Sequence, residues 1–253
     1  MTRHSPIQTI GINWDHPSGA SLLSDNTIVA AVQEERFSRQ KNDMAFPQGS
    51  LRYCMKQSAG HPINAIGIST HDVSYHGMLY HYATMPIPDH IREQHDVWYP
   101  RFYQNKRVND AFIFRDRWIK HQYPARYWKT YSAQKCDTYP RDSMNIVADF
   151  TGVSRSKIFR IEHHWCHAYY AYYTSPFKNK KAVVITVDGF GDGLNATVSL
   201  AEQGTLRRIY ETDICVLGRI YRHMTLLLGM KPLEHEYKLM GLAPYGEARY
   251  KDL

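Results

Sequence analysis

The order of apolar segments after residue 158 constrains the fold of this chain more than any other feature of its sequence. Strands and helices are predicted there from the spacing of apolar residues and from the turn residues between them. In order, they are a strand at 158–161, a helix at 163–173, a buried strand at 182–187, a hairpin of 196–200 with 206–210, and an amphipathic helix at 217–230. Strands interleaved with helices in this way indicate an α/β fold.

The first 70 residues show the same alternation. Short apolar runs at 9–14, 20–23 and 27–32 predict three strands, and Asp25-Asn26 predicts a tight turn between the last two. Phe46-Pro47 leads into a predicted helix that carries Leu51, Cys54 and Met55 on one face. Residues 65–70 have the composition of another short strand.

Residues 71–150 differ in kind from the segments on either side. They hold 16 of the 33 aromatic residues and five prolines, and they lack a regular apolar period. One interpretation is a largely helical insertion that packs its own aromatic side chains. A second, compatible interpretation is a substrate-recognition region, because tyrosine and tryptophan rings stack on sugars and bases.

Charge and cysteine content restrict the possible functions only loosely. The formal net charge of +7 favours anionic partners such as nucleic acid, an acidic sugar or a phosphorylated substrate, although a basic surface without a dedicated partner fits as well. The four cysteines form no CxxC pair, which excludes a zinc ribbon and a dithiol redox motif. With no apolar signal region and no apolar stretch of membrane-spanning length, the natural expectation is a cytoplasmic protein.

The sharpest chemical signal is the cluster Glu162-His163-His164-Trp165-Cys166-His167. His163 and His167 are four residues apart, so on a helix both imidazoles project from one face and suit a shared metal ion. Zinc peptidases use this spacing, but they need glutamate directly after the first histidine, where this chain has His164. Taken alone, the pair also fits two ordinary helix histidines.

A second signal is the segment 183–193, VVITVDGFGDG. An apolar strand delivers Asp188 to its carboxyl end, and glycines follow that would let main-chain N–H groups approach an anion. The aspartate carboxylate is a ligand for divalent cations. A simple β-hairpin is the alternative, but the order of strand, aspartate and glycines favours a phosphate or metal site.

Three further stretches stand out. His16 lies in a polar turn at a strand end, where an imidazole could take a proton from a hydroxyl near neutral pH. Arg36, Arg39 and Lys41 lie close together, either to bind an anion or to pair with the preceding glutamates. The segment 236–246, EYKLMGLAPYG, reads by itself as a helix end with a turn.

In this order, these segments resemble the N-terminal domain of the O-carbamoyltransferases of the nodulation and cephamycin type. The resemblance rests on sequence blocks that span most of the chain outside 71–150. They are GINWDHPSGASLL, AAVQEERFSRQK, FP and YC within 46–54, HHWCHA, VVITVDGFGDG, LGRIY and EYKLMGLAPYG.

The resemblance implies an actin-like ATPase fold, related to the threonylcarbamoyl-transfer proteins. It also implies a reaction in which carbamoyl phosphate and ATP give carbamoyl adenylate in a separate C-terminal domain. The carbamoyl group then moves to a substrate hydroxyl beside a metal, typically Fe(II). Because the acceptor is expected to be a sugar or another small molecule, we expect no nucleic-acid or membrane partner.

Residue roles follow from the same resemblance. His16 falls on the catalytic histidine and Lys41 on a lysine that lines the active site. His163, His167 and Asp188 fall on metal ligands. Residues that fall where the family holds the adenylate are Asp188, Gly189, Gly191 and Gly218. Pro17 and Gly19 depart from the family pattern beside His16, and they put its orientation in question.

The resemblance places residues 1–253 as an incomplete N-terminal domain, because the family's fourth metal ligand and its adenylate-forming domain lie further along the chain. The sequence is therefore expected to be a fragment or a truncated product. Two alternatives stay open: a non-catalytic, substrate-binding remnant, and an ATP-hydrolysing or kinase-type member of the same superfamily. The histidine pair speaks against the second.

Overall fold

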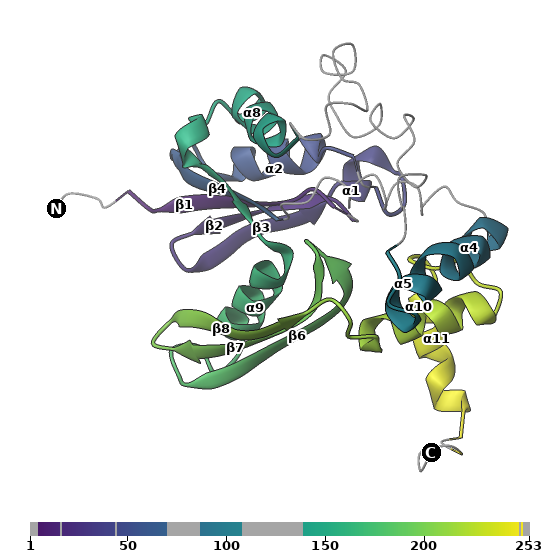
Figure 1. Ribbon diagram of the computed structural model, residues 1–253. Helices are drawn as coiled ribbons and strands as arrows, with labels where there is room; N and C mark the ends of the chain where they lie inside the picture. The colour runs from purple at the N-terminus through teal and green to yellow at the C-terminus, as the bar shows by residue number, and fades with distance from the viewer. Residues whose placement is uncertain are drawn as a thin grey trace.

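The computed structural model describes residues 5–15, 17–43, 45–69, 87–107, 139–247 and 249. Two β-sheets lie one above the other, and a group of helices stands at one end of both (Figure 1). This arrangement confirms the α/β class predicted from the sequence. Within the described ranges, no helix is both long enough and apolar enough to cross a membrane.

The first sheet has five strands in the order β3-β2-β1-β4-β5. The first three form an antiparallel meander, whereas β4 and β5 run parallel to β1. The strands are β1 (Gln8–Asn13), β2 (Gly19–Ser24), β3 (Thr27–Gln33), β4 (Ile63–Ser69) and β5 (Ile158–Ile161). The turn predicted at Asp25-Asn26 joins β2 to β3, and Asp25 has a left-handed φ of 52°.

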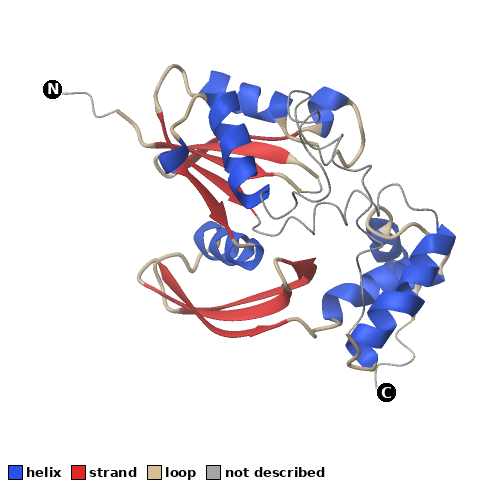
Figure 2. Ribbon diagram, turned by 45° about the horizontal axis from the view of Figure 1, so that its top comes forward, coloured by secondary structure: helices blue, strands red, loops and turns tan. Residues whose placement is uncertain are grey.

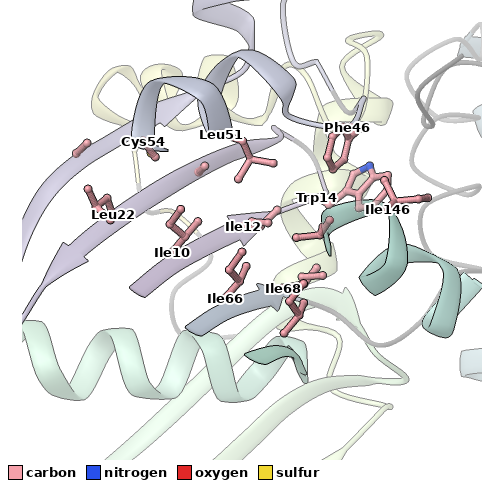
Figure 3. Close-up of a cluster of buried hydrophobic side chains, with 14 residues drawn as sticks. Ile10, Ile12, Trp14, Leu22, Phe46, Leu51, Cys54, Ile66, Ile68 and Ile146 are labelled. Atoms are coloured by element: carbon pink, nitrogen blue, oxygen red, sulfur yellow. The ribbon is translucent and has the colours of Figure 1, made fainter. Parts of the chain in front are cut away.

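Two helices, α2 (Gln48–Gln57) and α8 (Tyr139–Thr151), cover one face of this sheet (Figures 1 and 2). Between them and the strands lies the main core, in which alternate residues of β1 and β4 point toward the helices (Figure 3). Leu51 and Cys54 are buried on the predicted face of α2. Ile146 and Val147 of α8 belong to this core, so the end of the 71–150 segment is part of the main fold.

A short helix, α1 (Glu35–Ser38), follows β3 and carries Arg36. The preceding residue, Glu34, is buried and its carboxylate accepts hydrogen bonds from the main-chain N–H groups of Gly49 (2.9 Å) and Ser50 (2.8 Å). These donors belong to the first turn of α2, which has no side-chain cap of its own. Glu34 therefore fixes the start of α2 from 15 residues away.

The second sheet is an antiparallel meander of β6 (Ala182–Gly191), β7 (Leu194–Glu202) and β8 (Thr205–Thr212). The helix α9 (His163–Thr174) lies between the two sheets (Figures 1 and 2). Its buried residues Ala168 and Tyr172 pack on the second sheet against Val184, Ala201 and Leu206. Strand β6 runs on to Gly191, four residues past the predicted end, because the hairpin to β7 turns only at Asp192.

The helical group contains α10 (Leu217–Leu227) and α11 (Glu236–Leu242), together with residues 87–107 of the aromatic segment. That part forms α4 (Ile87–Glu93), the π-helix η1 (Gln94–Trp98) and α5 (Tyr99–Tyr103). A buried ion pair between Glu93 and Arg222 (3.1 Å) joins residues 87–107 to α10. Arg219 of α10 also lies 4.1 Å over the ring of Trp98. The described part of the predicted insertion is thus helical, and residues 70–86 and 108–138 lie outside the description.

Candidate metal centre

Three of the predicted site residues come together between the two sheets. His163 Nε2 lies 2.5 Å from Asp188 Oδ2 and 2.9 Å from His167 Nε2, and the distance from His167 Nε2 to Asp188 Oδ2 is 3.6 Å. Among the described residues, these three form the group of nitrogen and carboxylate ligands that could hold a metal ion. The His167 side chain is 52% exposed and that of His163 15%, so the group is open on one side.

The local structure explains this convergence. The two histidines lie one turn apart on α9, on the face that points away from the second sheet's core. Asp188 comes from β6, where the pairing with β7 is irregular between Val187 and Gly191. Such an irregularity redirects side chains at the edge of a functional site. The spacing of the histidines is thus a property of the helix, whereas their approach to Asp188 depends on how α9 packs on β6.

Negative charge dominates the electrostatics around His163. Burial lowers the pKa of this imidazole, but its hydrogen bond to Asp188 and the charges of Asp188, Asp15 and Asp192 outweigh that effect, and the pKa is raised above its ordinary value. Burial likewise raises the pKa of Asp188, yet the hydrogen bonds of His163 and His167 hold it well below the usual range. The carboxylate is therefore ionised, and the site favours a positive charge.

The donor set fits a divalent metal ion. The Nε2 atom of His163 points at both Asp188 and His167, although one imidazole nitrogen offers either a single proton or a single lone pair. A cation at the centre would satisfy all three atoms at once. Ligand atoms about 2.0–2.2 Å from a metal lie roughly 3.0–3.5 Å from one another, so the observed distances of 2.5–3.6 Å need adjustments of at most about 1 Å.

The glycines predicted to hold an adenylate also have a packing role at this centre. A Cβ atom on Gly191 would lie 2.2 Å from Cδ2 of His163, so the imidazole rests directly on this residue. A Cβ on Gly218, in the first turn of α10, would lie 2.3 Å from the carbonyl oxygen of Asp188. A Cβ on Gly189 would meet nothing within 4 Å, and its N–H donates to Asp188 Oδ1 (2.6 Å). Gly191 and Gly218 therefore permit the close approaches that build the site.

A capping network holds the start of α9 in place. The carboxylate of Glu162 accepts hydrogen bonds from the N–H groups of His164 (2.6 Å) and Trp165 (3.2 Å). Glu162 is also paired with Arg208 of β8, whose guanidinium lies 4.5 Å over the ring of Trp165. No role for Glu162 or Arg208 was predicted from the sequence. The position of Glu162 directly before a predicted helix was a signal for its capping role, whereas no local sequence feature marks Arg208.

His164 faces the opposite way from its two neighbours in the site. It is fully buried, and its Nδ1 is 2.8 Å from Thr186 Oγ1, which is itself 2.7 Å from Thr197 Oγ1. Burial lowers the pKa of this imidazole, so His164 is a neutral structural link between α9, β6 and β7. The third histidine of the sequence cluster thus packs α9 on the sheet rather than joining the candidate ligands.

The centre opens into a cleft of about 1260 Å³ between the first sheet and α9. Its lining includes His163, His167 and Asp188, together with Asp15 and Pro17 from the turn after β1. His16 itself lies outside the described residues, so its predicted catalytic role stays a prediction. Its two chain neighbours nevertheless border the same cleft as the candidate metal ligands.

The basic cluster after β3 contributes to the cleft only in part. Arg36 is among the lining residues, but Lys41 is not. The Nζ atom of Lys41 lies 3.4 Å from both carboxylate oxygens of Glu35, and its side chain is 79% exposed. In this conformation Lys41 is paired within its own loop, as the salt-bridge alternative predicted, and it is not brought to the three ligands.

Cys166 also borders the cleft, but its sulfur is not among the ligand atoms that converge on the candidate centre. Burial, aided by the charge of Glu162, raises the pKa of Cys166 to about 12. The thiol instead donates to the carbonyl oxygen of Ile161, 3.7 Å away. The candidate ligand set is therefore two imidazoles and one carboxylate.

The aromatic segment reaches the site through Phe190, which lies between Gly189 and Gly191 in β6. The ring of Phe190 lies 6.5 Å from that of Trp98, and Arg101 lies 5.6 Å over it. The described part of the insertion is therefore in contact with the strand that carries Asp188. This contact links the insertion physically to the candidate centre.

Comparison with known proteins agrees with the sequence blocks. A family model described as the carbamoyltransferase N-terminus matches residues 8–252. An uncharacterized protein of Synechocystis is 30% identical over 247 residues, which cover 96% of this chain and 35% of that protein. The nodulation protein NolNO of Sinorhizobium fredii is 27% identical over 243 residues, or 94% of this chain and 29% of that protein.

An uncharacterized protein of Methanocaldococcus jannaschii is also similar, at 26% identity over 93% of this chain and 33% of its own length. The chain thus spans about a third of the length of these curated relatives. The match to the family model covers nearly every residue and includes both sheets and α9. The chain therefore belongs to the carbamoyltransferase family and corresponds to its N-terminal domain.

Proposed function

We propose that this chain transfers a carbamoyl group to a hydroxyl of a sugar or another small natural product, as the N-terminal domain of an O-carbamoyltransferase. The observation that carries the proposal is the convergence of His163, His167 and Asp188 at the wall of a large cleft, in a chain of this family. An actin-like fold is part of the proposal. The meanders β1–β2–β3 and β6–β7–β8, one in each sheet, support it.

The donor in this proposal is carbamoyl adenylate, made from carbamoyl phosphate and ATP elsewhere in the whole protein. Its phosphate is anionic, and the net charge of +7 favours its approach. In this proposal, Gly189, Gly191 and Gly218 are the residues at which the nucleotide is expected to approach the main chain near Asp188. A cytoplasmic location, where ATP and carbamoyl phosphate are available, belongs to the same proposal.

In the transfer step, His16 takes the proton of the acceptor hydroxyl, and the hydroxyl oxygen bonds to the carbamoyl carbon. The bond between that carbon and the phosphate oxygen breaks, and AMP leaves. In this proposal a divalent metal ion, Fe(II), would be held by His163, His167 and Asp188 and would polarise the carbamoyl carbonyl. The capping network around Glu162 keeps the two histidines oriented for this task.

Metal binding is the first test. The purified chain is stripped with a chelator and titrated with Fe(II) without oxygen, and we expect one ion per chain. His163→Ala should abolish binding, whereas His61→Ala, which changes an exposed histidine outside the cleft, should leave it unchanged. If wild type and His163→Ala hold equal amounts of metal, the site assignment is wrong.

Transfer is tested on the whole protein, with the adenylate-forming part present. It is incubated with ATP, carbamoyl phosphate and a panel of sugars and other hydroxyl compounds, and products are analysed by mass spectrometry. We expect a carbamoylated acceptor whose formation is lost in His16→Ala. Absence of any carbamoylated product across the panel, in metal-loaded protein, would count against the proposed activity.

A further inference from the structure

Two carboxylates from different parts of the chain hold the first turn of α9. Glu162 caps the N–H groups of His164 and Trp165, as a residue directly before a helix commonly does. The N–H of His163 is bound instead by Oδ2 of Asp192, at 2.8 Å, from 29 residues further along the chain. The main chain of a candidate ligand is thus tied directly to the β6–β7 hairpin, whose first strand carries Asp188.

The turn at Asp192 is shaped for this contact. Gly191 pairs with Leu194, so Asp192 and Gly193 form a two-residue turn, with φ angles of 48° and 85°. Left-handed angles at both positions are typical of a type I′ hairpin turn, where Asp-Gly, Asn-Gly and Gly-Gly are favoured. Asp192 therefore meets the backbone requirement of the turn and also supplies an acceptor aimed at α9.

His163 is fixed at two points by this hairpin. Asp192 holds its main-chain N–H, and Gly191 lies against its ring, where even a Cβ atom would be only 2.2 Å from Cδ2. Asp188 lies on β6, the strand that ends at Gly191, and its Oδ2 atom is 2.5 Å from Nε2 of His163. A shift of α9 relative to the hairpin would change the distance between these two ligand atoms directly.

We propose that Asp192 is a positioning residue of the metal centre: its carboxylate fixes the His163 main chain on the hairpin that carries Asp188. This role rests on the proposed metal site. Asp192 is not part of the group of ligand atoms that converge on the centre, and its Oδ2 atom accepts a hydrogen bond from the N–H of His163. Residues that orient metal ligands in this way typically change metal affinity by about 10–100-fold when they are removed.

Asp192→Gly is the appropriate test variant, because glycine keeps the left-handed turn and removes only the carboxylate. Asp192→Asn keeps both the turn preference and a hydrogen-bond acceptor. Each chain is stripped of metal and titrated with Co²⁺ in competition with a chelator, well below its melting temperature. We expect Asp192→Gly to raise the dissociation constant by about 10-fold or more. Asp192→Asn should recover most of this loss.

Glu34→Gly is the matched control, because Glu34 is another carboxylate that binds the first turn of a helix from a distance, here α2. It should lower the melting temperature and leave the Co²⁺ affinity unchanged. Wild-type affinity in Asp192→Gly, with only a lower melting temperature, would reduce Asp192 to a helix cap and overturn the inference. If wild type and His163→Ala bind Co²⁺ equally, the assignment of the metal site is wrong, and so is the positioning role of Asp192.

Discussion

The contact between Gly218 and Asp188 leads to a sharp prediction about Gly218→Ala. The added Cβ would lie 2.3 Å from the carbonyl oxygen and 2.4 Å from the carbonyl carbon of Asp188. Both atoms belong to the main chain, so no side-chain rotation relieves the overlap. To reach an ordinary contact of 3.4 Å, α10 and the Asp188 main chain must separate by about 1.1 Å.

The expected cost follows from two opposing effects. Overpacking a rigid contact destabilises a protein by about 1–3 kcal/mol. Replacing glycine by alanine in a helix returns up to about 1 kcal/mol. Because the overlap involves two main-chain atoms, we expect a net loss of about 1–2 kcal/mol, which corresponds to a melting temperature lower by roughly 2–8 °C for a chain of this size.

Metal affinity should change as well, because the displaced main chain carries the Asp188 carboxylate with it. A movement of about 1.1 Å is large beside the 2.5 Å that separates this carboxylate from His163, and we expect an affinity loss of about 10-fold or more. Thermal melting and Co²⁺ titration measure the two effects. Gly189→Ala is the control for both, because its Cβ meets nothing within 4 Å. If Gly218→Ala melts and binds like Gly189→Ala, the close approach is not a feature of the protein.

Three further predictions concern stability. Leu51→Ala removes a fully buried side chain of α2 and should lower the free energy of unfolding in urea by about 2–5 kcal/mol; a loss below about 1 kcal/mol would contradict its place in the core. Burial raises the pKa of Cys54 from 9.0 in the unfolded chain to about 11 in the folded protein. Between these two pH values the unfolded chain loses the thiol proton more readily than the folded protein, so the contribution of Cys54 to stability is complete below pH 9 and is lost as the pH rises toward 11. The difference in unfolding free energy between wild type and Cys54→Ala should therefore narrow above pH 9, and a constant difference would argue against a buried thiol. Gly241→Ala, within α11 and with open space around its Cβ, should raise stability by up to about 1 kcal/mol, whereas a lower melting temperature would refute that reading of the helix.

Much of the local structure could be predicted because it depends on local patterns. The strand at residues 158–161 and the start of α9 at His163 coincide with the prediction, since apolar runs and polar breaks mark them in the sequence. The predicted end of the strand after residue 187 was wrong. The Asp192-Gly193 pair, a strong hairpin signal, lies further along and sets the true turn. The alternatives of hairpin and binding site are not exclusive, because one segment provides both the turn and Asp188.

The site divides in the same way. The sequence by itself determined that His163 and His167 share a helix face, because four-residue spacing places side chains together on any α-helix. Only the tertiary structure decided that Asp188 meets them, that His164 is buried on Thr186, and that Lys41 is held by Glu35. These contacts depend on how α9, β6 and the loop after β3 pack, and no residue spacing encodes that geometry. The physical reason is that a helix fixes its own periodicity through local hydrogen bonds, whereas distant segments are placed by burial and by close approaches such as that of Gly218 to Asp188.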